Sequence, residues 1–210
     1  MNESIRITCK ANIIYAINKL KQYRTDARSD PGTSKPNPDI ENTCFVGGTQ
    51  IHAEDGIWDI ELIGSGDMVL SRCEETGELM YREVIRRFEH EDQETFCVRY
   101  ENELGEMDWV VTTAGHPFWV KNIGWIKAID LKEGHELEIC DPYQRHPTRD
   151  REKWRIAVTE KLTRTWPARV ISVTNQHSLR TVYNFEVEGF HTYFVGNFGV
   201  LVHNKNNESI

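Results

Sequence analysis

Beyond residue 44 the hydrophobic pattern of this chain has a period of two, and that pattern limits the fold more than any other feature. Runs rich in Val, Ile, Tyr, Trp and Thr, which favour strands, end in Gly, Asp or Asn turns about every ten residues. The domain is therefore predicted to be nearly all β. We expect strands over residues 68–72, 81–85, 95–100, 107–113, 168–174, 182–187, 192–195 and 198–202, with hairpin turns at 75–78 and 102–105.

The first part of the chain has a different character. Apolar residues between 11 and 23 recur every three or four positions, which predicts a short amphipathic helix. Prolines at 31, 36 and 38 then fix φ and remove backbone donors, so residues 25–42 are predicted to be a linker. We divide the chain into an N-terminal flank (1–43), a main domain (44–204) and a C-terminal flank (205–210).

Composition excludes several classes of partner. With 25 Lys and Arg against 33 Asp and Glu, the net charge is −8, so no basic field attracts nucleic acid. The cysteines form no CxxC pair and the histidines no HxxxH pair, so we expect no disulfide framework, metal or cofactor. No signal-peptide core and no run of about 20 apolar residues occurs. On this chain alone we expect a cytoplasmic monomer without membrane contact.

Two motifs place a thiol and an imidazole at the edges of strand-like runs. Cys44 opens the main domain; its thiol is a nucleophile if it ionises and meets an electrophile, although a Cys beside Phe and Val is also an ordinary core residue. Thr113 and His116 flank a turn that ends a β-branched run. Such a turn leaves the imidazole accessible with the threonine beside it, and the alternative is a surface histidine without a role.

A third motif is His203-Asn204, which ends an apolar strand although Asn is unfavourable in strands. One interpretation is a simple turn. The other is chemical, because the side-chain amide nitrogen of Asn can attack its own backbone carbonyl, forming a succinimide and cutting the chain. That reaction needs an acid or base: His203 adjoins the carbonyl, and His191 is placed to lie on a neighbouring strand.

As a set, these motifs resemble the self-processing domains of the Hint superfamily, which includes inteins, bacterial intein-like domains and the hedgehog autoprocessing domain. The resemblance covers the main domain and includes strand-entry segments at 66–69 and 124–131. It implies an all-β, horseshoe-shaped Hint fold, here with the short N-terminal helical extension. It also implies an autocatalytic domain whose substrate is its own chain in cis.

At the N-terminal junction the resemblance implies that Cys44 attacks the carbonyl of Thr43, converting the amide into a thioester by an N-to-S acyl shift. Thr113 and His116 would hold and polarise this amide. His116 would protonate the departing nitrogen, since an amine is a poor leaving group without a proton.

At the C-terminal junction the resemblance implies that Asn204 cyclises and releases Lys205 onward. His203 would act on the scissile carbonyl or the leaving amine, and His191 would carry protons. Splicing inteins place Cys, Ser or Thr after the terminal Asn, whereas a lysine ammonium is mostly protonated near pH 7 and accepts acyl groups poorly. We therefore expect cleavage at both junctions, with residual splicing as an alternative.

Two further features distinguish this chain from large splicing inteins. Asn184 stands where many inteins have an Asp, which removes a carboxylate that could assist proton transfer. The segment between His116 and Tyr183 is too short for a homing endonuclease, so no DNA cleavage is expected. In polymorphic toxins the Hint module precedes a toxin, so the parent protein could carry one and be exported.

Two other classes of protein, triad hydrolases and metal-binding proteins, have less support from the sequence. Gly64-Ser65-Gly66 does not match the GxSxG elbow of triad hydrolases, and metal-ligand spacing is missing. A Hint fold that has lost its chemistry and acts as an inert binding module is the remaining alternative, and it predicts an uncut chain.

Overall fold

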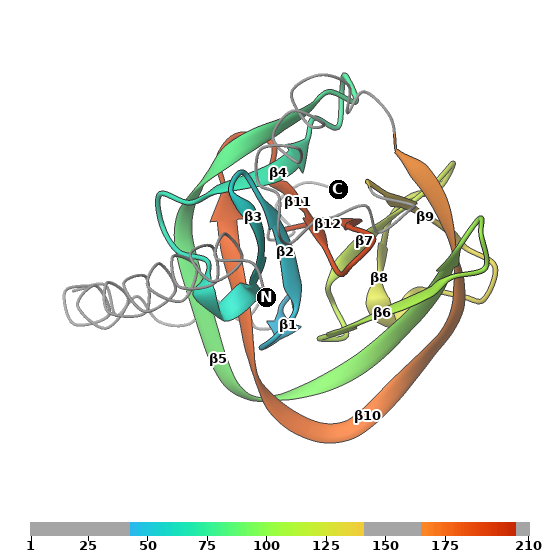
Figure 1. Cartoon of the computed structure of the whole chain (residues 1–210). Coiled ribbons are helices and arrows are strands. Elements are labelled where there is room, and N and C mark those ends of the chain that lie inside the picture. The colour runs from blue at the N-terminus through green and yellow to red at the C-terminus, as the bar shows by residue number, and fades with distance from the viewer. Residues whose placement is uncertain (1–42, 141–164, 205–210) are drawn as a thin grey trace, which may run out of the picture. The chain divides into compact units, whose positions relative to one another are not determined.

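A computed structural model describes residues 43–140 and 165–204. Contacts divide the chain into residues 1–36 and 37–210, and the described residues all belong to the second unit. They form twelve strands and two 3-10 helices, so the prediction of a nearly all-β domain is confirmed (Figure 1). The elements are β1 (Phe45–Val46), β2 (Gln50–Ala53), β3 (Gly56–Asp59), η1 (Ile60–Leu62), β4 (Met68–Arg72), β5 (Leu79–Asn102), β6 (Met107–Thr112), β7 (Pro117–Val120), β8 (Gly124–Lys127), η2 (Ala128–Asp130), β9 (Glu136–Ile139), β10 (Trp166–Val187), β11 (Thr192–Val195) and β12 (Val200–His203).

Two long antiparallel strands, β5 and β10, curve side by side around the shorter strands (Figure 1). Each replaces two strands that the sequence pattern predicts separately. The predicted strand limits at 85, 95, 174 and 182 are therefore wrong, because the strands continue through them. The strands pair from Ala168↔Asn102 to Val187↔Val84, because register shifts let the ribbon bend without ending. Asp92 and His177 lie at two of these shifts and have positive φ, 54° and 49°.

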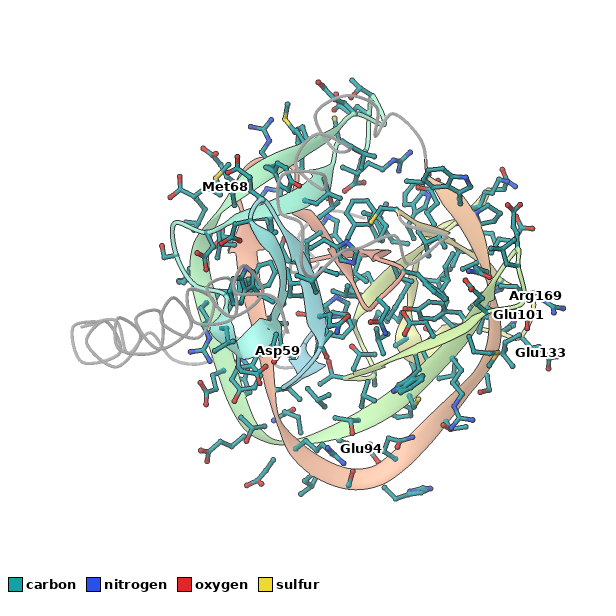
Figure 2. The ribbon with its side chains drawn as sticks, in the orientation of Figure 1. Asp59, Met68, Glu94, Glu101, Glu133 and Arg169 are labelled. Carbon is teal, nitrogen blue, oxygen red and sulfur yellow. The ribbon has the colours of Figure 1, made fainter. Side chains whose placement is uncertain are left out.

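Charged residues along these long strands obscure them in the sequence. Arg87 and Glu89 form an exposed ion pair at 2.9 Å within β5, and Arg169 of β10 meets Glu101 of β5 at 2.5 Å. Figure 2 shows Arg169 and Glu101 together at one edge of the ribbon. Polar side chains can continue a strand when one face is solvated and the partner strand supplies the hydrogen bonds. The charged side chains therefore form a solvated face of the ribbon.

The core lies between the curved ribbon and the short strands. Its largest fully buried side chains are aromatic or branched aliphatic: Phe45, Ile51, Ile60, Ile63, Leu70, Tyr100, Phe118, Leu137, Phe185, Tyr193, Phe194 and Phe198. Trp109, in contrast, is 60% exposed because it points to the outer face of β6.

Strand pairing brings the two ends of the predicted domain together. β1 lies between β10 and β6, with Phe45 opposite both Tyr183 and Thr112. β12 pairs with β11 and places His203 opposite Thr192.

The predicted helix at 11–23 and linker at 25–42 lie outside the described residues, as does Lys205. Within the described ranges, no helix has the length and apolar character needed to cross a membrane.

Candidate active site

The peptide bond between Thr43 and Cys44 is held from the nitrogen side by the end of β6. The backbone N–H of Cys44 donates to Oγ1 of Thr113 at 2.9 Å. The N–H of Thr113 returns a hydrogen bond to the carbonyl of Cys44 at 2.9 Å, and Oγ1 of Thr112 donates to the same carbonyl at 2.7 Å. Cys44 is fully buried. The structure therefore brings Thr113 to the nitrogen that would depart in an acyl shift.

The carbonyl side of the same peptide bond is held by Asn184 of β10. Nδ2 of Asn184 donates to the carbonyl oxygen of Thr43 at 2.5 Å. Oδ1 of Asn184 accepts from the N–H of Phe185 at 2.8 Å and from the hydroxyl of Tyr193 at 2.9 Å. A backbone N–H can only donate, so the atom it meets must be the oxygen, and the nitrogen must face Thr43.

Sequence reasoning missed this contact. It identified Asn184 only as the loss of a carboxylate, whereas in the structure the amide supplies a donor to the carbonyl. The contact joins residues 141 positions apart, so no local pattern reveals it. The usable signal was a short polar residue inside the apolar run of β10, where Asn is unfavourable.

His116 lies beside this peptide bond inside a cage of aromatic rings. It is fully buried, with its ring centroid 4.1 Å from Phe45, 6.0 Å from Phe118 and 6.2 Å from Tyr193. The expectation of an accessible turn imidazole is therefore wrong, because the turn after β6 points the ring into the core. Among the described residues neither ring nitrogen has a hydrogen-bond partner in good geometry, and the polar group that acts on the ring is the backbone of Thr43.

Burial lowers the pKa of His116 from 6.5 to about 3; the backbone of Thr43 opposes this shift and the charge of His203 adds to it. The imidazole is therefore neutral at pH 7. A neutral ring can accept a proton first and donate it later, but it cannot begin as an acid. This modifies the order of proton transfers expected from the sequence.

At the other end of the domain, β11 and β12 position Asn204. Its N–H donates to the carbonyl of His191 at 2.8 Å, and its Nδ2 donates to the carbonyl of Phe185 at 2.8 Å. The rings of His191 and His203 are 6.4 Å apart. His191 has a positive φ of 55°, where the chain turns into β11. The structure thus brings both predicted histidines to the predicted asparagine.

The two predicted junctions are linked through Phe185. Its N–H orients Asn184, which contacts the carbonyl of Thr43, and its carbonyl accepts from Nδ2 of Asn204. His116 and His203 are also close enough to interact electrostatically. All six residues predicted from the sequence therefore lie in one region of the domain.

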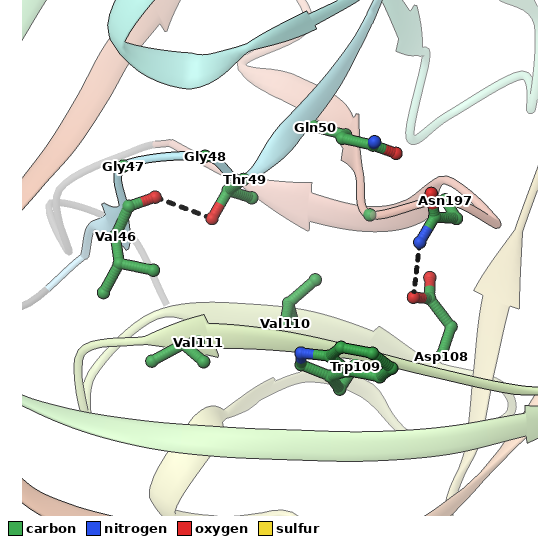
Figure 3. A pocket seen from close by; sticks show the side chains of 11 residues that line it. Val46, Gly47, Gly48, Thr49, Gln50, Asp108, Trp109, Val110, Val111 and Asn197 are labelled. Atoms are coloured by element: carbon green, nitrogen blue, oxygen red, sulfur yellow. Dashed lines mark hydrogen bonds between the residues drawn. The ribbon is translucent and has the colours of Figure 1, made fainter.

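A separate cavity of about 240 Å³ lies between the turn after β1, the face of β6 and the turn after β11 (Figure 3). None of the predicted catalytic residues lines it. Its acidic residue, Asp108, accepts hydrogen bonds from Tyr100, Asn197 and Phe198 at 2.7 to 3.1 Å, so it serves the fold. Among the described residues no group of three His, Cys, Asp or Glu is arranged to hold a metal ion.

Comparisons with known proteins identify the fold and the family. A family model described as "Pretoxin HINT domain" matches residues 50–141. The solution structure of a bacterial intein-like domain from Clostridium thermocellum is similar, with 30% identity, a TM-score of 0.60 and coverage of 77% of this chain and 98% of that one. No curated protein matches the chain.

Two inteins share the fold at lower identity. A DnaB intein from Synechocystis sp. PCC 6803 has 18% identity and a TM-score of 0.56, covering 76% of this chain and 96% of its own. The DnaX mini intein from Spirulina platensis has 20% identity and a TM-score of 0.56, covering 76% and 98%. The fold, the matching family model and the intein-like relative together lead to one conclusion: this chain belongs to the Hint superfamily, among its bacterial intein-like domains.

Proposed function

We propose that the domain cuts its own chain at two places, between Thr43 and Cys44 and between Asn204 and Lys205. The observation that carries the proposal is the contact of the first peptide bond on both sides, by Thr113 at its nitrogen and by Asn184 at its oxygen. The donor from Asn184 stabilises the negative charge that attack at the carbonyl carbon places on the oxygen, and Thr113 orients the nitrogen that must depart.

In the first reaction Sγ of Cys44 attacks the carbonyl carbon of Thr43. Neutral His116 accepts the thiol proton and delivers it to the nitrogen of Cys44 as the C–N bond breaks and the C–S bond forms. Asn184 donates to the oxygen that becomes negative. Burial raises the pKa of Tyr193 well above 10, and the charge of Cys44 adds a smaller increase. The Tyr193 hydroxyl therefore remains a donor that orients Asn184.

In the second reaction Nδ2 of Asn204 attacks the carbonyl carbon of its own residue. The bond to the nitrogen of Lys205 breaks, the leaving amine gains a proton, and the product is a C-terminal succinimide. Asn204 must first leave the carbonyl of Phe185, which holds the attacking nitrogen in the resting state. His203 supplies the proton exchange, and His191 carries protons to it.

Cleavage rather than splicing follows from the residue after Asn204. Lys205 offers no thiol or hydroxyl to accept the acyl group, so the thioester passes to water or to an external thiol. The description of the matching family as a pretoxin domain supports a longer parent protein, in which cleavage frees a toxin segment. The partners are then the chain's own flanking segments.

The test is intact mass spectrometry of the chain with a reporter domain fused at each end. We expect fragments that end at Thr43 and at Asn204, the first lost in Cys44→Ala and the second in Asn204→Ala. Added thiol should speed release of the N-terminal reporter. A single uncut mass, unchanged by thiol, would mean that the fold has lost its chemistry.

A further inference from the structure

The turn between β4 and β5 places a carboxylate against the predicted C-terminal site. Oε1 of Glu74 lies 3.1 Å from Nε2 of His203. The other oxygen, Oε2, accepts a hydrogen bond from the indole N–H of Trp125 on β8 at 3.0 Å. The ring of Trp125 also packs against that of His203, with centroids 4.9 Å apart and planes at 70°.

These contacts give both oxygens of Glu74 a partner and limit the orientations of His203. The side chain of Glu74 is 40% exposed, whereas that of His203 is only 11% exposed. The glutamate therefore reaches from the surface to the outer edge of a mostly buried imidazole. Surface ion pairs contribute little to stability on average, so we expect this pair to add little to the stability of the fold.

We infer that Glu74 is a positioning residue for Asn204 cyclisation: its carboxylate holds Nε2 of His203, so that Nδ1 is the nitrogen that exchanges protons at the Asn204–Lys205 bond. Nδ1 is bonded to Cγ and is thus the ring nitrogen nearer the main chain. A carboxylate in this position also stabilises the imidazolium that forms when His203 takes up a proton. The inference rests on the proposed function, since it assigns a role within the second cleavage.

A pH profile distinguishes this role from a structural one. Among the described residues, three titratable groups contact or interact with His203: Glu74 from the turn after β4, His191 before β11, and His116 beyond the end of β6. Glu74 is the acidic member of this group, so replacing it with a neutral residue disfavours the imidazolium. The limb of the pH–rate profile that reports protonation of His203 then moves to lower pH, whether His203 acts as acid or as base.

The experiment uses the full chain with both reporters and follows each cleavage separately by intact mass. Glu74→Gln should slow cleavage at Asn204–Lys205 about tenfold or more and move its pH limb to lower pH. Cleavage at Thr43–Cys44 should keep its rate. Glu75→Gln, in the same exposed turn, is the matched control and should leave both rates unchanged. Glu74→Asp should recover part of the rate, because it restores the charge.

Two further variants separate this inference from the proposed function. If His203→Gln slows the second cleavage and Glu74→Gln adds nothing in that background, the two residues act as one unit. Equal slowing of both cleavages by Glu74→Gln, or an unmoved pH limb, would overturn the inference and leave the proposed function intact. If His203→Gln itself has no effect, the assigned role of His203 fails and the inference fails with it.

Discussion

The amide nitrogen of Asn184 donates to the carbonyl oxygen of Thr43 at 2.5 Å, and the hydroxyl of Tyr193 holds the amide in that orientation from 2.9 Å. Many inteins have an Asp at this position, and an ionised carboxylate cannot donate. The Asn therefore changes the character of the contact, from a charge to a neutral donor directed at the carbonyl.

Replacing Asn184 with Asp should slow cleavage at Thr43–Cys44, because a negative carboxylate would face the oxygen that becomes negative during attack. Loss of one such donor costs about 100- to 1,000-fold in other enzymes, and Asn184→Ala should show a loss of that size. Thiol-induced release of the N-terminal reporter measures both. Faster cleavage in Asn184→Asp would contradict the assigned role and favour the carboxylate chemistry of other inteins.

The Tyr193→Phe variant should slow the same cleavage by a smaller factor, about tenfold or less, because the N–H of Phe185 still holds Asn184. The two sites should be coupled. In an Asn184→Ala background the loss of the hydroxyl should have no further effect on the rate, since the group that it orients is gone. Additive losses would show that Tyr193 acts by another route.

Thr113→Val should slow N-terminal cleavage about tenfold, because Val keeps the shape of the side chain but cannot accept the N–H of Cys44. Thr95→Val is the matched control. The Thr95 hydroxyl is buried and has no hydrogen-bond partner among the described residues, so its removal should preserve the rate. Similar losses in both variants would assign the effect to packing.

His116 should make folding stability depend on pH. Its pKa is about 3 in the folded chain, lowered from 6.5. Between these values the unfolded chain binds a proton that the folded chain does not, so stability is full above about pH 6.5 and falls on acidification, by about 1.4 kcal/mol per pH unit. Urea unfolding of an uncut Cys44→Ala, Asn204→Ala chain at pH 7, 6 and 5 measures this. Adding His116→Gln should flatten the dependence; an unchanged slope would mean that His116 is not buried in its neutral form.

Lys205→Cys should convert cleavage into ligation, because a thiol at this position can accept the acyl group from the Cys44 thioester before Asn204 cyclises. A fused product of the two reporters, identified by mass, is the expected result. Lys205→Ala controls for the loss of the ammonium and should give only cleaved fragments. Cleavage without ligation in Lys205→Cys would mean that the two junctions do not come within transfer distance.

Some strands can be predicted from the local sequence pattern alone. The strands β4 and β11 have the limits that the alternation of apolar residues predicts, and both predicted hairpins form. The full length of β5 and β10 cannot be predicted in this way, because their charged middle segments form strands only when each supplies the other's hydrogen bonds. The limits of the main domain at 44 and 204, and the catalytic roles of its residues, stay predictions.

The sequence by itself determined the β character, the family resemblance and the identity of Cys44, His116 and Asn204 as candidates, since periodicity and motif spacing are local properties. Tertiary structure alone decided what these residues face. The burial of His116, the donor from Asn184 and the carboxylate of Glu74 all depend on how distant strands pair, because a contact between residues far apart in the chain is set by sheet register and not by spacing. The sequence therefore names most reacting groups, while the fold sets their protonation and orientation.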